Sequence, residues 1–285
     1  MKFDKIFSFL IKIIAYFSIL ILAFIIFFIA KESTGAFSQI SFFDFLFGTE
    51  WHPIKAEPQI EILPMITATI YVSLVAILIS LPIGIGTAVF LSTVINKKFK
   101  KIFDPLVDIL AGIPSVIYGL IGFVVIVKSF EEYFSFPSGE SVLAGGILLS
   151  IMVLPYIIST VKESMVRIQE NYKISSQALG VSKWHMIRYL ILPAAKKSII
   201  AGLILAFGRA MGETMAVMMV IGNSPIMPKL FGRAQTIPAL IALEMSGAQI
   251  NSLHYHSLFA AGLLLMFILF GINIIFYRLK EKSDF

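Results

Sequence analysis

Two charged residues, Arg209 and Glu213, lie inside a long apolar stretch of the sequence. The stretch covers residues 198–221, and its 24 residues can cross a bilayer core of about 30 Å at about 1.5 Å per helical residue. Inserting one such charge near the bilayer centre costs about 2.5–3.5 kcal/mol. Because the two residues are four apart, they share one face of a helix and can form an ion pair that offsets part of this cost.

The pair admits two interpretations. The first is an anion pathway, in which the planar guanidinium of Arg209 binds an oxyanion and Glu213 holds the guanidinium when no anion is present. Thr214, the next residue, is included in this predicted pathway. The second interpretation is an ion pair that only locks two helices together. Charged residues inside membrane segments usually mark transport pathways, which favours the first interpretation.

Small residues with helical spacing predict close helix packing beside the pair and in a preceding apolar segment, residues 109–127. They are Gly208, Gly212, Gly112, Ser115 and Gly119. Pro114 predicts a bend within that preceding segment.

The composition is that of a membrane protein with several spans. Of its 285 residues, 58% are hydrophobic and only 14% are charged. The formal net charge of +6 does not indicate nucleic-acid binding, because the basic residues form short blocks between apolar runs. The chain has no cysteine, and its four histidines have no metal-ligand spacing. We therefore expect no metal, no cofactor and no catalytic group.

Hydropathy predicts an all-α integral membrane protein with six transmembrane helices. The expected spans are residues 13–30, 62–96, 109–127, 141–161, 198–221 and 256–277. Most Lys and Arg residues fall on one side of this arrangement, which predicts that both termini are cytoplasmic. Residues 1–63 then form an N-terminal helix with an external loop, and residues 64–285 form the core. An aromatic piece at residues 42–47 is expected to lie at the membrane surface.

The longest charged segment, residues 162–197, is predicted to be a cytoplasmic helix–turn–helix. Gly180 suits the end of its first helix, and Ser182 can cap a second helix over residues 183–192 that Pro193 follows. Trp184 lies on one apolar face of the second helix, together with Ile187 and Ile191. This face either docks a partner protein or packs on the protein's own membrane helices.

The same segment resembles the EAA loop of bacterial ABC importer permeases. The likeness rests on Ala178-Leu179-Gly180, followed nine residues later by Leu190-Ile191-Leu192-Pro193. The sequence departs from the family where Ile174-Ser175-Ser176 replaces the usual Glu-Ala-Ala. The resemblance implies that this loop, including Trp184, seats in a groove of an ATP-hydrolysing subunit.

Three further motifs resemble the PstC-type permease of phosphate importers. They are the segment from Gly112 to Gly119, the segment from Gly208 to Thr214, and Ile241-Ala242-Leu243-Glu244-Met245. The likeness extends from about residue 9 to residue 280. It implies a type I (MetI-like) permease fold in the bacterial inner (plasma) membrane, with passage of phosphate past Arg209 and Glu213.

The resemblance also implies several partners: a second permease (PstA-like), an ATPase dimer (PstB-like), an external phosphate-binding protein (PstS-like) and membrane lipid. The sequence itself contains no G-x-x-x-x-G-K-[ST] motif. This chain is therefore not expected to be an enzyme, and ATP hydrolysis is expected on a partner.

Alternatives remain open at this point. The same machinery could carry another oxyanion, such as phosphonate, sulfate or molybdate. A proton-coupled carrier with Glu213 as the proton site, or a membrane sensor that transports nothing, would also use an intramembrane ion pair.

Overall fold

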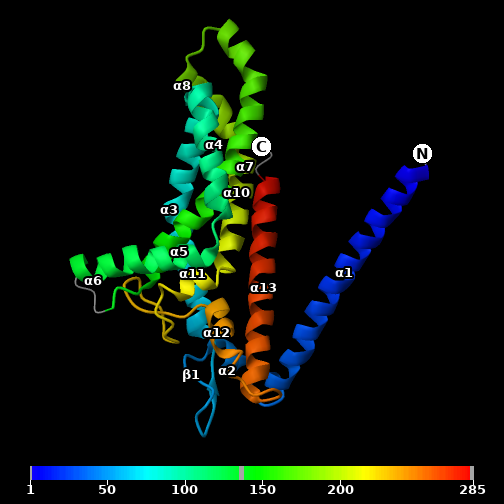
Figure 1. Cartoon of the computed structure of the whole chain (residues 1–285), viewed down its shortest axis with the longest axis vertical. Helices are drawn as coiled ribbons and strands as arrows, with labels where there is room; N and C mark the ends of the chain where they lie inside the picture. The colour runs from blue at the N-terminus through cyan, green and yellow to red at the C-terminus, as the bar shows by residue number, and fades with distance from the viewer. Residues whose placement is uncertain (1, 135–137, 283–285) are drawn as a thin grey trace. The chain divides into compact units, whose positions relative to one another are not determined.

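The computed structural model describes residues 2–134 and 138–282, which are mostly helical (Figure 1). Four helices in this part of the chain are long and apolar enough to cross a membrane: Phe7–Phe37, Leu63–Val94, Val142–Ala178 and Leu253–Glu281. Two bent helix pairs raise the total to six if each counts as one span. The predicted all-α, multi-span class is confirmed.

The chain forms two compact units. The first contains the first 63 residues together with residues 241–267, and the second contains residues 64–240 and the C-terminal part from residue 268. The helix Leu253–Lys282, α13, contributes to both.

The first unit begins with α1 (Lys2–Phe37), whose apolar residues between Phe7 and Phe28 are exposed. The predicted aromatic piece is a short helix, α2 (Phe42–Phe47), with Phe45 buried against Phe37. A small hairpin follows, which the sequence did not predict. It pairs β1 (Trp51–His52) with β2 (Gln59–Ile60), and Trp51 lies opposite Ile60.

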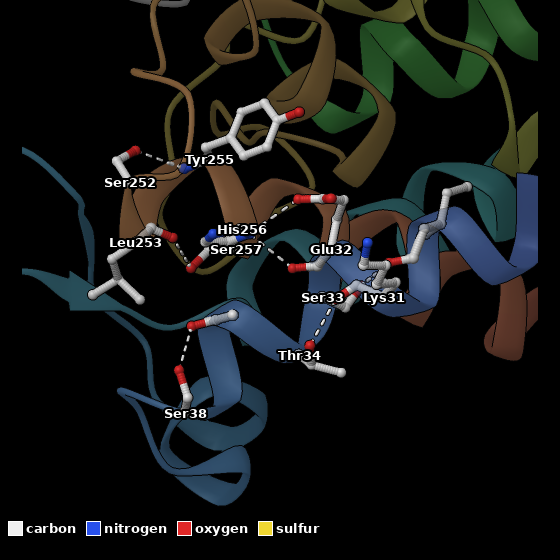
Figure 2. A network of polar contacts seen from close by, with 12 residues as sticks. Lys31, Glu32, Ser33, Thr34, Ser38, Ser252, Leu253, Tyr255, His256 and Ser257 are labelled. Carbon is white, nitrogen blue, oxygen red and sulfur yellow. Dashed lines mark hydrogen bonds and ion pairs between the residues drawn. The ribbon is translucent and has the colours of Figure 1, made fainter.

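A polar network in this unit joins α1 to α13 (Figure 2). His256 Nδ1 lies 2.9 Å from the backbone oxygen of Glu32 and 3.4 Å from its carboxylate. Gly35 lies against the same imidazole, and a Cβ at this position would be 2.6 Å from the ring. The absence of a side chain at Gly35 therefore allows this contact.

The second unit contains the remaining elements. They are α3 (Leu63–Val89), η1 (Phe90–Val94), α4 (Lys97–Gly112), α5 (Ser115–Ile121), η2 (Gly122–Val127), α6 (Lys128–Phe134), α7 (Val142–Ala178), α8 (Lys183–Met186), η3 (Ile187–Ile191), α9 (Leu192–Ala194), α10 (Lys196–Met211), α11 (Met215–Met218) and the first half of α12 (Ile237–Glu244). The segments labelled η are π-helical turns.

α7 is the central helix of this unit, with α10 and α4 packed along it (Figure 1). A Cβ at Gly202 of α10 would lie 3.5 Å from Val161 of α7, an ordinary contact distance. A Cβ at Gly84 of α3 would lie only 2.7 Å from Ile157 of α7. Small residues thus let membrane helices approach α7 closely.

The predicted third span, residues 109–127, is wrong as a single helix. α4 ends at Gly112, α5 begins at Ser115, and the two directions differ by 95°. Pro114 forces this break because a residue before proline avoids helical geometry. Ile113 accordingly has an extended backbone, with a ψ of 129°. The basic block at residues 97–101 is the first turn of α4.

The predicted fourth span, residues 141–161, and the helix predicted to end at Gly180 form one continuous helix. α7 runs unbroken for 37 residues, about 55 Å at the usual helical rise. This length carries the helix well beyond a bilayer core. The fifth span, residues 198–221, is not one helix. α10 ends at Met211, and its other end meets the preceding helical segment, Lys183–Ala194, at 61°.

Candidate functional site

The predicted ion pair is present at the end of α10. An Nη2 atom of Arg209 lies 3.1 Å from Oε2 of Glu213. The two side chains differ sharply in exposure, since Arg209 is 43% exposed and Glu213 only 4%. The carboxylate therefore lies within the protein, and the guanidinium lies at its surface. A charge in a membrane segment does not face lipid, so this surface adjoins a partner protein or a water-filled space.

The pair lies at a break between two helices. Arg209 is in the last turn of α10, and Glu213 lies among the three residues that separate α10 from α11. Glu213 Oε1 accepts a hydrogen bond of 3.4 Å from the backbone N–H of Ala216 at the start of α11. A cation at a helix C-terminus and an anion at a helix N-terminus are each favourable. Broken helices of this kind form the binding sites of many transporters.

Thr214 lies in the same break and is half-buried. Its hydroxyl donates a hydrogen bond of 3.4 Å to the backbone oxygen of Gly212. Arg209, Glu213 and Thr214 thus lie within six residues of one another at this helix break. Their assignment to a substrate pathway stays a prediction.

Within the described part of the chain, almost nothing packs against the two glycines beside Arg209, Gly208 and Gly212. A Cβ at Gly208 would meet nothing within 4 Å, and one at Gly212 would meet only the backbone oxygen of Gly208 at 3.5 Å. The face of α10 at the pair is consequently open. Such a face can receive a helix of another subunit or line a conduit.

The second group of small residues is divided by the bend at Pro114. Gly119 on α5 packs tightly on the helix that follows the ion pair, since its Cβ would lie 2.6 Å from Met219 Sδ and 3.1 Å from Ala216 Cα. Ser115 is half-buried at the start of α5. Gly112 lies on α4, where a Cβ would meet nothing within 4 Å. α5 therefore packs on α11, and Gly112 does not share this contact.

Sequence reasoning missed Tyr118. Its hydroxyl donates a hydrogen bond of 2.9 Å to the backbone oxygen of Leu110, across the 95° bend between α4 and α5. The residue is 7% exposed. Tyr118 thereby fixes the angle at which α5 reaches α11. The sequence offers one signal for this role: Tyr118 is an aromatic residue inside the segment from Gly112 to Gly119.

The coupling segment, residues 178–193, begins at the last residue of α7. Ala178 ends that helix, and Gly180 has a φ of 67°, which a residue without a side chain adopts most readily. Ser182 Oγ accepts a hydrogen bond of 3.3 Å from His185 N, so the predicted cap is confirmed. Leu192 and Pro193 lie in the short helix α9.

The apolar face predicted for this segment divides in two. Ile187 and Ile191 are buried, at 3% and 0% exposure, and pack on the protein's own helices. Trp184 and Leu179 are exposed, at 68% and 79%. An exposed tryptophan and leucine on a turn that projects from a helix end offer an apolar contact to another protein. A docking role for this exposed part of the segment stays a prediction.

The described residues contain no group of three or more His, Asp or Glu side chains placed to hold a metal ion. The guanidinium of Arg209 itself offers a fixed positive charge with planar hydrogen-bond donors.

The chain is similar in sequence to known membrane transport proteins. Residues 80–284 match the family described as binding-protein-dependent transport system inner membrane component. The probable phosphate transport system permease protein PstC of Methanocaldococcus jannaschii is 37% identical, over 84% of this chain and 82% of its own length. PstC of Xylella fastidiosa is 33% identical over 86% and 82%. The probable ABC transporter permease protein YqgH of Bacillus subtilis is 36% identical over 80% and 74%.

Among solved structures, the MetNI methionine ABC transporter in inward-facing conformations is similar, with a TM-score of 0.57. The match covers 79% of this chain and 94% of that one at 15% sequence identity, so it establishes the fold alone. The MetI-like fold and the family resemblance predicted from the sequence are both confirmed. The chain belongs to the family of binding-protein-dependent transport system inner membrane components, as a multi-pass membrane subunit that works with a binding protein and a separate ATPase.

Proposed function

We propose that this chain is a permease subunit of an ATP-driven importer that moves inorganic phosphate into the cytoplasm. Relatives named as phosphate permeases, which are 31–37% identical over most of the chain, support this substrate. The observation that carries the proposal is the exposed guanidinium of Arg209, held by the buried carboxylate of Glu213 at a break between helices.

A phosphate ion can use this arrangement as follows. The exposed side of the Arg209 guanidinium offers N–H groups in a planar fork that matches the oxygens of an oxyanion. Glu213 stays beneath the guanidinium and competes for it. The carboxylate thus limits how tightly the anion is held, and weak binding is what passage through a conduit needs. Thr214 adds a hydroxyl one residue further along the chain.

Transport proceeds by alternating access. A second permease (PstA-like) covers the open face of α10 at Gly208 and Gly212, so the two subunits enclose the conduit. An ATPase dimer (PstB-like) binds the exposed Trp184 and Leu179 of the coupling segment. Closure of the ATPases moves that segment, and the rigid helix α7 that leads into it carries the motion into the membrane.

The proposed topology puts both termini and the coupling segment in the cytoplasm. The loops at residues 31–63 and 223–255 then face outward. An external phosphate-binding protein (PstS-like) docks on this side and delivers phosphate. The excess of Lys and Arg in residues 162–197 supports this orientation.

The experiment is uptake of radiolabelled phosphate into proteoliposomes that contain the complete complex, the binding protein and ATP inside. We expect uptake that requires ATP and survives a protonophore. Competition by sulfate, molybdate or a phosphonate at equal concentration should be weak. Strong competition by one of them would assign the site to that oxyanion. Uptake that does not require ATP and that a protonophore abolishes would establish a proton-coupled carrier that uses Glu213.

A further inference from the structure

A cavity of about 680 Å³ lies in the second unit, between the end of α7 and the coupling segment. Its walls come from four parts of the chain. They include Ser92 and Thr93 of η1, Lys100 of α4, Gln169 and Lys173 of α7, and Met186 of α8. The volume is within the range of about 300–1,000 Å³ that is typical of small-molecule sites.

The cavity is basic. Three lysines line it, Lys100, Lys173 and Lys183, against a single acidic residue, Glu170. They reach it from three different elements, α4, α7 and α8, so the positive charge is gathered by the fold and not by one run of sequence. Converging positive charges around a cavity raise the local concentration of anions.

The lining also has groups for both parts of an amphiphilic ligand. Hydroxyl and amide groups of Ser92, Thr93 and Gln169 can donate hydrogen bonds to phosphate oxygens. Leu91 and Met186 supply apolar contacts. Basic pockets between membrane helices bind the headgroups of anionic lipids.

We propose that this cavity binds an anionic phosphate group, carried either by the headgroup of an acidic phospholipid or by free phosphate. The site is separate from the pathway at Arg209, shares no residue with it and does not depend on the transported substrate. Its occupant would contact η1 and α4 on one side and α8 on the other. It would therefore brace the coupling segment against the membrane helices.

The test compares two double variants of the full chain, each of which removes two positive charges. Lys100→Gln/Lys173→Gln alters the cavity. Lys98→Gln/Lys101→Gln is the matched control, because both lysines are exposed on α4 and neither lines the cavity. Binding is measured in detergent by native mass spectrometry for phosphatidylglycerol and phosphatidylcholine, and by equilibrium dialysis for labelled inorganic phosphate. Arg209 is unchanged in both variants, so the difference between them reports the cavity alone.

We expect the cavity variant to bind phosphatidylglycerol, inorganic phosphate or both at least about tenfold more weakly than the control, because charge-assisted contacts are lost. An effect on the lipid alone identifies the headgroup as the source, and an effect on inorganic phosphate alone identifies the free ion. Equal binding by the two variants would overturn the proposal. Equally tight binding of phosphatidylcholine and phosphatidylglycerol to the wild-type chain, together with equal binding of inorganic phosphate by the two variants, would do so as well.

Discussion

Glu213 supports Arg209 from inside the protein: their side chains are 3.1 Å apart, yet the carboxylate is 4% exposed and the guanidinium 43%. The same carboxylate also accepts a hydrogen bond from Ala216 N, at the start of α11. One side chain thus sets both the position of the cation and the geometry of the helix break. In a membrane segment, such a cation is accessible only to protein, water or a passing ion.

Glu213→Gln should slow phosphate transport while phosphate binds more tightly. The amide keeps an oxygen for Ala216 N but no longer neutralises Arg209, so the anion meets an uncompensated charge. We expect the turnover of phosphate uptake to fall by about tenfold and the half-saturating phosphate concentration to fall with it, as one lost charged contact predicts. Uptake kinetics in proteoliposomes measure both. An unchanged turnover, or a rise in the half-saturating concentration, would contradict this role of Glu213.

Gly119→Ala should destabilise the protein, whereas Gly112→Ala should not. A Cβ at Gly119 would lie 2.6 Å from Met219 Sδ and 3.1 Å from the Ala216 backbone, so the Met219 side chain must move and α5 must shift away from α11 by a few tenths of an ångström. Overpacking of this kind costs about 1–3 kcal/mol. A Cβ at Gly112 meets nothing within 4 Å. Thermal unfolding of the two variants in detergent makes the comparison, and equal melting temperatures would argue against the α5–α11 contact.

Glu244→Ala should loosen the first unit around Trp51. Trp51 Nε1 donates a hydrogen bond of 2.9 Å to Glu244 Oε2, which also lies 2.7 Å from His254 Nε2. The variant leaves a buried indole N–H without its acceptor, at a cost of about 1–3 kcal/mol.

The chain has only two tryptophans, so in a Trp184→Phe background the fluorescence comes from Trp51. We expect a shift of the emission to longer wavelength on Glu244→Ala. Glu57→Ala, on the exposed turn of the hairpin, is the control and should leave the emission in place. If Trp184→Phe alone, with Glu244→Ala and with Glu57→Ala all give the same emission spectrum, Glu244 does not hold Trp51.

Trp184→Ala should weaken binding of the ATPase. Trp184 is 68% exposed on the coupling segment, and exposed aromatic anchors contribute much of the energy of protein interfaces. We expect about tenfold less ATPase to co-purify with the permease, since removal of such an anchor costs about 2 kcal/mol or more. Tyr133→Ala removes an 80% exposed aromatic residue elsewhere, on α6, and should change nothing. If both variants retain the ATPase equally, the segment is not its main contact.

The sequence predicted the features that depend on local pattern. Hydropathy identified the long apolar helices, and the spacing of Arg209 and Glu213 predicted their ion pair. The cap at Ser182 was also predictable, because its side chain bonds only three residues away. The end of α7 next to Gly180 was predictable from that glycine, whereas the continuity of the helix from Val142 to Ala178 was not, since apolar character falls after Val161. Hydropathy reports the edge of the membrane and not the end of the helix.

Features set by tertiary contacts could not be predicted. Pro114 indicated a bend, but its size depends on where α5 packs and on the hydrogen bond from Tyr118 to Leu110. That bend also separates Gly112 from Gly119, which helical spacing had placed on one face. The division of the coupling segment into buried Ile187 and exposed Trp184 likewise depends on the helices beneath it.

The role of Arg209 is tested most directly by ATP-driven phosphate uptake in proteoliposomes with Arg209→Ala. Arg167→Ala is the matched control, because Arg167 also pairs with a glutamate four residues away, Glu163, but both are exposed on α7. Co-purification of the partner subunits verifies that each variant assembles. We predict that Arg209→Ala lowers uptake by about a hundredfold or more, as expected when the anion loses its charged contact and the buried Glu213 carboxylate loses its partner, and that Arg167→Ala leaves it near the wild-type rate. Wild-type uptake by an assembled Arg209→Ala complex would contradict the account.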